Sequence, residues 1–179
     1  MKLAILDRDG VINENSPDYI KSPEEWYPLP GSLEAIARLK RAGWRVAVAT
    51  NQSAIGRGLI TQATLEAIHA SMARALEAHG GRIDVLAYCP HTPDDHCDCR
   101  KPASGLLREI STRLGTGLAG VPFIGDNSSD VLAARAVGAR PILVRTGYGE
   151  ATAAEYPDVP VFDDLAAAVN SLLSTERER

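Results

Sequence analysis

Cysteine is scarce in this sequence, and its distribution is uneven. All three cysteines, Cys89, Cys97 and Cys99, fall within one short stretch. An odd number of cysteines confined to a single loop argues against the disulfide framework of a secreted domain. Metal ligation is the better interpretation of these residues.

The sequence also lacks long apolar runs and an excess of positive charge. No uninterrupted apolar stretch is long enough to span a bilayer, and the apolar run after Met1-Lys2 ends at Asp7, so we expect no signal peptide. The formal net charge of −4 and the pI near 5.6 provide no basic field that would attract nucleic acid or an anionic membrane. We therefore expect a cytoplasmic protein that binds neither, in which single basic residues recognise phosphate.

The length and the apolar content set the domain count. With 179 residues, of which 45% are hydrophobic, the chain can bury one sizeable core but is too short for two ordinary domains. We expect a single domain spanning residues 1–179. Because the sequence has no obvious additional interface, we also expect a monomer.

Short apolar runs alternate with segments that have helical spacing. The runs predict buried strands at Leu3–Leu6, Trp44–Ala49, Ile83–Tyr88, Val121–Gly125, Pro141–Val144 and Pro160–Phe162. Helical spacing predicts two helices that begin at Ser32 and Thr61, a third that follows Ser104 and a fourth at Val131–Val137. A last helix follows a cap at Asp163-Asp164, and we expect it to fray from Thr175 to Arg179. This alternation predicts an α/β fold, a three-layer Rossmann-like parallel sheet with helices on both faces.

The first predicted strand ends in two acids. Asp7 and Asp9 follow Leu3–Leu6 directly, and Gly10 comes next. Taken alone, this pair could hold a metal for one of several reactions or form a solvated loop. The polar, proline-broken stretch from Val11 to Pro30 then forms a loop that could face a substrate.

Polar clusters follow the other predicted strands as well. Because the carboxyl ends of parallel strands meet at one edge of a sheet, these clusters should converge there. Carboxylates from different strands, such as Asp7 and Asp126, can share Mg²⁺. Lys101, Thr50 and the Asn51 amide can stabilise a phosphoryl group in transfer. The four clusters are Asp7/Asp9, Thr50/Asn51, Arg100/Lys101 and Asp126/Asp130.

The order of these clusters resembles the haloacid dehalogenase-like phosphatases. The family's four motifs match Asp7-Arg8-Asp9-Gly10, Thr50-Asn51, Lys101 and Gly125-Asp126-Asn127-Ser128-Ser129-Asp130. Together with Thr50-Asn51-Gln52-Ser53, the cysteine loop and Arg100-Lys101-Pro102, the pattern most resembles the branch that removes one phosphate from a heptose bisphosphate during synthesis of the lipopolysaccharide core precursor. Histidinol-phosphate phosphatases are its close sibling.

The resemblance implies a two-step phosphoryl transfer. Asp7 would be the nucleophile that forms an aspartyl-phosphate, and Asp9 the general acid and then the general base. Mg²⁺ would be held by the carboxylates of Asp7 and Asp126 and by the backbone carbonyl of Asp9. Asp130 would orient Lys101 or a metal-bound water. The chain departs from the family pattern at Val11, where threonine is common. It also has no room for a separate cap domain, so short loops must enclose the substrate.

The cysteine loop at 89–99 offers a second metal site. Cys89, His91, Cys97 and Cys99 suit tetrahedral structural Zn²⁺, and His96 is a rival fourth ligand. We expect this zinc to hold Arg100 and Lys101 in place.

Candidates for binding a small phosphorylated sugar follow from their positions near the motifs. Arg57 and Lys21 are better explained as solvated surface residues, and His69 as a packed or surface histidine. The substrate-binding candidates are Asn15, Ser16, Pro17, Asp18, Asn51, Gln52, Ser53, Arg100 and Asn127.

Two other function classes remain open at this point. The cysteine loop could be a zinc-ribbon-like interaction module on an inert scaffold, although the acidic composition disfavours this. A phosphotransferase or mutase could use the same aspartyl-phosphate and pass the phosphoryl group to a sugar instead of water.

Overall fold

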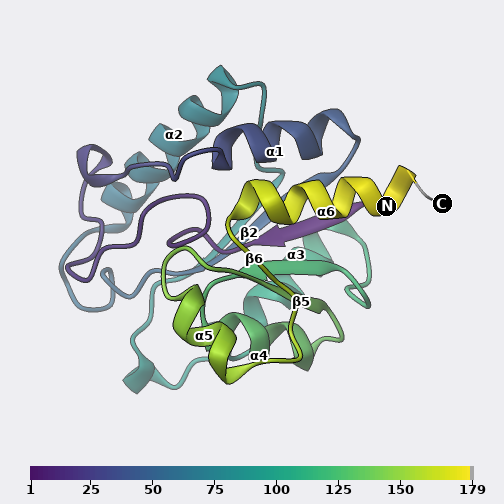
Figure 1. Ribbon diagram of the computed structural model, residues 1–179. Helices are drawn as coiled ribbons and strands as arrows, with labels where there is room; N and C mark the ends of the chain where they lie inside the picture. Colours follow the sequence, from purple (N-terminus) through teal and green to yellow (C-terminus); the bar gives the residue numbers. More distant parts are fainter. Residues whose placement is uncertain (178–179) are drawn as a thin grey trace.

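A six-stranded parallel sheet forms the centre of the protein. The computed structural model describes residues 1–177, and its strands are arranged in the order β3-β2-β1-β4-β5-β6 (Figure 1). All neighbouring strands pair in parallel, which confirms the predicted sheet. The strands are β1 (Leu3–Leu6), β2 (Arg45–Asn51), β3 (Val85–Cys89), β4 (Pro122–Gly125), β5 (Arg140–Val144) and β6 (Val161–Phe162).

Helices cover both faces of this sheet. The helices α1, α2 and α6 lie on one face, and α3 and α4 on the other, with α5 beside α4 (Figure 1). Two short 3₁₀ helices, Pro23–Glu25 and Pro93–Asp95, lie in the connecting loops. The six α-helices are α1 (Ser32–Arg41), α2 (Gln62–Ala78), α3 (Gly105–Leu114), α4 (Ser128–Ala136), α5 (Gly149–Glu155) and α6 (Leu165–Arg177).

The alternation of side chains along the central strands builds two cores. In β1, Ala4 and Leu6 pack with the residues of α1 and α6, whereas Leu3 and Ile5 pack with those of α3 and α4. Successive residues of a strand point to opposite faces, and here both faces are covered. This is why the strands of this chain are apolar throughout and do not alternate with polar residues.

Two helices differ from the prediction. The sequence pattern did not predict α5, because Gly149–Glu155 contains no large apolar side chain that would mark a buried face. Helix α4 begins at Ser128, three residues before the expected Val131, because Asn127 and Asp130 form a capping box.

The C-terminal helix is capped as expected. Asp164 accepts a hydrogen bond from the backbone N–H of Ala167 at 2.8 Å. The helix continues to Arg177. The expected fraying from Thr175 stays a prediction, and Glu178 and Arg179 lie outside the described residues. In the described part of the chain, no helix is both long and apolar enough to cross a membrane.

Candidate active site

The predicted polar clusters meet at the carboxyl edge of the sheet. Strands β1 and β4 are neighbours, and the chain leaves them toward opposite sides of the sheet, so their carboxyl ends flank a crevice of the kind that binds ligands in open α/β folds. Asp7 follows β1, and its backbone N–H donates to Ile124 of β4 at 2.9 Å. The cavity here has a volume of about 450 Å³ and is lined by Asp7, Asp9, Asn15, Thr50, Asn51, Pro93, Arg100, Lys101, Pro102, Asp126, Asn127, Ser129 and Tyr148.

Gly10 allows the turn after β1 to lie against Asp126. Its φ of 84° is in the left-handed region, and a Cβ at this position would lie 2.1 Å from Asp126 Oδ2. The same carboxylate oxygen accepts a hydrogen bond from the Tyr148 backbone N–H at 2.9 Å. Any larger residue at position 10 would therefore clash with the Asp126 carboxylate and displace it.

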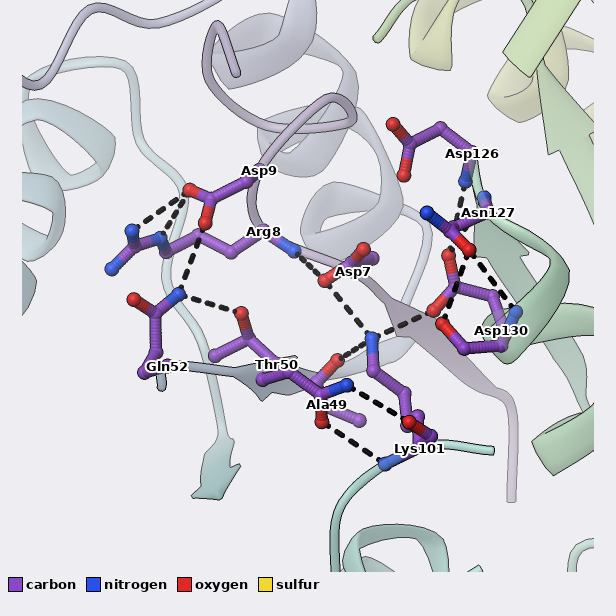
Figure 2. A network of polar contacts seen from close by, with 12 residues as sticks. Asp7, Arg8, Asp9, Ala49, Thr50, Gln52, Lys101, Asp126, Asn127 and Asp130 are labelled. Carbon is purple, nitrogen blue, oxygen red and sulfur yellow. Dashed lines mark hydrogen bonds and ion pairs between the residues drawn. The ribbon is translucent and has the colours of Figure 1, made fainter. Parts of the chain in front are cut away.

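Lys101 is a buried ammonium group with three acceptors. It donates to Asp130 Oδ1 at 2.7 Å and to the Ala49 carbonyl at 2.7 Å, and it lies 3.1 Å from Asp7 Oδ1 (Figure 2). Burial by itself lowers the pKa of Lys101, but the charges of Asp130 and Asp7 outweigh it and raise this pKa above its ordinary value. The side chain therefore remains a cation beside Asp7.

Asp130 is occupied by protein partners on both oxygens. Its Oδ1 binds Lys101, and its Oδ2 accepts the backbone N–H groups of Asp126 and Asn127, both at 3.1 Å (Figure 2). This geometry agrees with the orienting position expected for Asp130. The ligand oxygens of Asp7, Asp126 and Asp130 lie within 4.8 Å of one another, and Asp7 and Asp126 have oxygens left for a cation.

The carboxylates repel one another in this cluster. Burial, together with the charge of Asp130, raises the pKa of Asp126 to about 7, and burial and Asp130 likewise raise the pKa of Asp7 against the opposing effect of Lys101. A hard divalent cation between Asp7 and Asp126 would offset this repulsion. The oxygen donors fit Mg²⁺, which binds through one or two carboxylates and keeps water or phosphate oxygens as its other ligands.

Asp9 lies in a ring of hydrogen-bond donors. Its Oδ1 accepts from Arg8 Nε at 2.8 Å and Asn13 Nδ2 at 2.9 Å, and its Oδ2 accepts from Gln52 Nε2 at 3.1 Å. Burial raises the pKa of Asp9, but the Arg8 charge and these hydrogen bonds outweigh it, so the pKa lies below its ordinary value. Asp9 is therefore ionised at neutral pH in this arrangement.

Gln52 and Asn51 hold other site residues in place. Gln52 Nε2 also donates to Thr50 Oγ1 at 2.9 Å. Asn51 Oδ1 accepts from the Lys101 backbone N–H, and Asn51 Nδ2 donates to the Lys101 carbonyl, both at 3.0 Å. The side-chain amide of Gln52 thus fixes Thr50, and that of Asn51 fixes the Lys101 backbone. Both residues also line the cavities described below.

The predicted substrate-binding residues divide between two adjacent cavities. Asn15, Asn51, Arg100 and Asn127 line the main one. A neighbouring cavity of about 290 Å³ includes Ser16, Pro17, Gln52 and Ser53 and shares Asp9, Asn15, Asn51, Arg100 and Tyr148 with the first. Asp18 is exposed and lines neither of these cavities. It lines a third cavity of about 360 Å³, which shares Asn15 and Ser16 with them.

Sequence reasoning missed two residues beside the site. Tyr148 lines both cavities, but it follows no strand-end motif that could have marked it. Arg57 was expected to be a solvated surface residue. Arg57 is exposed, as expected, and it also lines the neighbouring cavity, with its guanidinium 5.9 Å from the centre of the Tyr19 ring.

The cysteine loop forms a compact cluster beside Arg100. Cys99 Sγ lies 3.0 Å from Cys89 Sγ and 3.5 Å from Cys97 Sγ, and His91 Nδ1 lies 3.2 Å from Cys99 Sγ. Tetrahedral Zn²⁺, with bonds of about 2.0–2.3 Å, places its ligand atoms about 3.3–3.8 Å apart. The separations in this cluster run from 3.0 to 3.6 Å, so shifts of a few tenths of an ångström would let these four residues, whose donor chemistry suits zinc, surround the ion. His96 is exposed and does not belong to the cluster.

Comparison with known proteins identifies relatives that match almost the whole chain. A family model described as HAD-hydrolase-like matches residues 98–168. The D-glycero-beta-D-manno-heptose-1,7-bisphosphate 7-phosphatase of Pseudomonas putida is 55% identical over 175 residues, which cover 97% of this chain and 100% of the relative. The enzyme of that name from Bordetella bronchiseptica is 53% identical over 97% of this chain and 98% of its own length.

A solved structure agrees with these relatives. The crystal structure of D,D-heptose 1,7-bisphosphate phosphatase from B. bronchiseptica, complexed with magnesium and phosphate, superimposes with a TM-score of 0.95. The two chains are 52% identical, and the match covers 98% of this chain and 99% of that one.

Proposed function

The chain belongs to the D-glycero-β-D-manno-heptose-1,7-bisphosphate 7-phosphatase family of haloacid dehalogenase-like hydrolases, and we propose that it removes the 7-phosphate from the β anomer of this sugar bisphosphate. The observation that carries the proposal is the convergence of Asp7, Lys101 and Asp126 on one cavity. The substrate is the one that the names of the relatives state, and the reaction supplies a precursor of the lipopolysaccharide core.

In the first step, an Asp7 carboxylate oxygen attacks phosphorus as the bond to the sugar oxygen breaks. Lys101 and Thr50 stabilise the charge on the phosphoryl oxygens in transfer. Asp9 protonates the departing sugar oxygen, which leaves an aspartyl-phosphate on Asp7. The ionised Asp9 can take up this proton when the substrate binds, because a phosphate dianion beside it raises its pKa.

In the second step, water replaces the sugar. Asp9, again a carboxylate, removes a proton from the water as its oxygen attacks the phosphorus of the aspartyl-phosphate. The bond between phosphorus and Asp7 breaks, inorganic phosphate leaves, and Asp7 returns to its initial state. Transfer to water distinguishes this reaction from that of a mutase or phosphotransferase.

Asp7, Asp126 and the Asp9 backbone carbonyl would hold Mg²⁺. When bound, the ion neutralises charge so that a carboxylate can approach a phosphate dianion. The pKa of Asp126, which burial and then the charge of Asp130 raise to about 7, also supports the proposal, because a bound cation would favour the ionised form of this buried carboxyl. The presence of magnesium in the B. bronchiseptica crystal structure supports Mg²⁺ as the cation.

Cys89, His91, Cys97 and Cys99 would hold a structural Zn²⁺. The zinc-bound loop would keep Arg100 and Lys101 at the cavity, since the Arg100 backbone N–H already donates to Cys97 Sγ at 3.4 Å. A non-enzymatic zinc module does not account for the buried Asp7–Lys101 pair at the sheet edge.

Substrate choice is tested by comparing kcat/KM for the α and β anomers of the heptose bisphosphate and for histidinol phosphate. The proposal expects the β anomer to be the best substrate, with release of inorganic phosphate and heptose 1-phosphate. A preference for histidinol phosphate would refute it, and phosphoryl transfer to a sugar would favour the mutase alternative. We further propose a cytoplasmic monomer, which sedimentation of the purified protein and fractionation of its source cells would test.

A further inference from the structure

Arg8 is a fully buried arginine within the nucleophile turn, and the reaction described above gives it no task. Its guanidinium binds on one side to Asp9, with both Nε and Nη2 at 2.8 Å from Oδ1. On the other side, Arg8 Nη1 lies 3.0 Å from Nε2 of His69, a residue of α2. The guanidinium therefore joins a histidine on a surface helix to the proposed proton shuttle.

The chemistry of arginine fixes the direction of the bond to His69. A guanidinium can only donate hydrogen bonds, so His69 Nε2 must be the acceptor and must carry no proton. His69 is then the neutral tautomer with its proton on Nδ1. In agreement with this, burial and the charge of Arg8 lower the pKa of His69 to about 3.

The contacts of Arg8 distinguish the two oxygens of Asp9. Oδ1 accepts hydrogen bonds from Arg8 Nε and Asn13 Nδ2, and it also lies 2.8 Å from Arg8 Nη2 in an ion pair. In the described part of the chain, Gln52 is the one donor to Oδ2. Gln52 also donates to Thr50, and Asp9 itself lines the cavity, so Oδ2 is the Asp9 oxygen that retains room for a proton. Figure 2 shows the Asp9 carboxylate directed toward Arg8 and Gln52.

We infer that His69 is a positioning residue for proton transfer: it accepts a hydrogen bond from Arg8, which thereby fixes Asp9 through Oδ1 and leaves Oδ2 to carry the proton. This inference rests on the role proposed for Asp9. Without His69, the buried Nη1 donor loses this acceptor, and the guanidinium must shift to find another. A shift of Arg8 displaces Asp9 Oδ1 and turns the carboxylate.

Two substitutions separate hydrogen bonding from packing. His69→Gln can keep an acceptor for Arg8 but loses the ring, which lies 6.1 Å from the Tyr88 ring centre. His69→Phe keeps a ring and loses the acceptor. If the hydrogen bond to Arg8 matters, His69→Phe should lower kcat/KM more than His69→Gln does. If ring packing matters, His69→Gln should lower it more.

The leaving group reveals whether the effect passes through Asp9. Departure of a sugar oxygen requires a proton, whereas p-nitrophenolate leaves as a stable anion, so only the sugar phosphate depends on a well-placed general acid. The measurement is kcat/KM for both esters with Mg²⁺ and zinc-loaded protein, because kcat/KM reports the steps up to release of the leaving group.

We expect His69→Phe to lower kcat/KM for the heptose bisphosphate by roughly tenfold or more and to leave that for p-nitrophenyl phosphate within about twofold. His69→Gln should recover most of the loss. Equal losses with both esters, or a larger loss in Gln than in Phe, would overturn the inference. Melting curves verify that each variant folds. If His69→Phe does not fold, His69→Met takes its place, because methionine also leaves Arg8 without a strong acceptor.

The proposed function is tested separately in the wild-type protein. If wild-type protein hydrolyses another alkyl phosphate but not the heptose bisphosphate, the substrate assignment fails. The His69 variants are then compared with that alkyl phosphate and p-nitrophenyl phosphate. If Asp9→Asn retains wild-type kcat/KM for the alkyl ester, the role of Asp9 is refuted, and the inference about His69 with it.

Discussion

Lys101 Nζ lies 3.1 Å from Asp7 Oδ1, and both side chains are almost completely enclosed. The ammonium group opposes the effects of burial and of the neighbouring carboxylates on Asp7, and so favours the ionised form that can attack phosphorus. Because Asp130 and the Ala49 carbonyl bind the same ammonium group, its position does not depend on a substrate. The nucleophile and its counter-charge are thus organised before the substrate binds.

Asp7→Asn should abolish turnover while the protein stays folded. The amide has nearly the same shape but cannot form the aspartyl-phosphate, so we expect kcat to fall by at least about a thousandfold. Release of phosphate from the heptose bisphosphate measures the effect. Asp18→Asn, an exposed change that lines neither of the two cavities that Asp9 lines, is the matched control and should leave kcat unchanged. Activity in Asp7→Asn near that of wild type would assign the nucleophile to another residue.

Lys101→Met should impair both catalysis and stability. It removes the donor to the phosphoryl group, which should lower kcat roughly 10²–10³-fold. It also leaves Asp7 and Asp130 buried without their partner, which should cost about 3–5 kcal/mol of unfolding free energy. Phosphate release and urea unfolding measure the two effects. In the control Lys21→Met, whose ammonium group is partly exposed, both quantities should stay near wild type, and a similar loss there would contradict the site-specific role.

Titration of Asp126 should lower the stability of magnesium-free protein as the pH rises from about 4 to about 7, whereas His69, whose pKa in the folded protein is about 3, titrates in the same window with the opposite sign. The pKa of Asp126 is near its ordinary value in the unfolded chain and about 7 in the folded protein, so at this carboxyl the folded state binds more protons in this window and loses that advantage as pH rises through 7. Added Mg²⁺ should stabilise the protein more at pH 8 than at pH 5, because the ion binds the deprotonated carboxylates. Melting temperatures across this range, with and without Mg²⁺, provide the test.

Asp126→Asn is the control for that pH dependence. The variant lacks the titrating carboxylate, so its melting temperature should rise relative to that of the wild type as the pH increases from 4 to 7, and it should respond less to Mg²⁺. An unchanged pH profile in this variant would show that another group causes the effect.

Replacement of Cys97 and Cys99 by serine should release zinc. The double variant should contain much less than one zinc per chain by elemental analysis, and its melting temperature should fall because the loop loses its cross-link. His96→Ala is the control, since His96 is exposed and outside the cluster, and its zinc content should match that of wild type. Equal zinc in the cysteine variant and the wild type would remove zinc from the proposed structure.

Much of the fold could be predicted because its signals are local. Each central strand is a short run of apolar residues, and the acids and amides that follow it mark the point where the strand ends. This was sufficient to predict a parallel sheet and to bring Asp7, Thr50, Lys101 and Asp126 to one edge. Helix α5 has no such signal, since its small side chains create no apolar stripe.

Residue chemistry and order along the chain were thus enough to identify the fold class, the family and the acids at the sheet edge. They could not show that Asp18 lies outside the two cavities that Asp9 lines, that Arg57 and Tyr148 line them, or that His69 binds Arg8. The last pair is separated by 61 positions, and its contact exists because α2 packs beside the turn after β1. Local patterns report strand ends and helix faces, whereas partners distant in sequence are determined by how these elements pack.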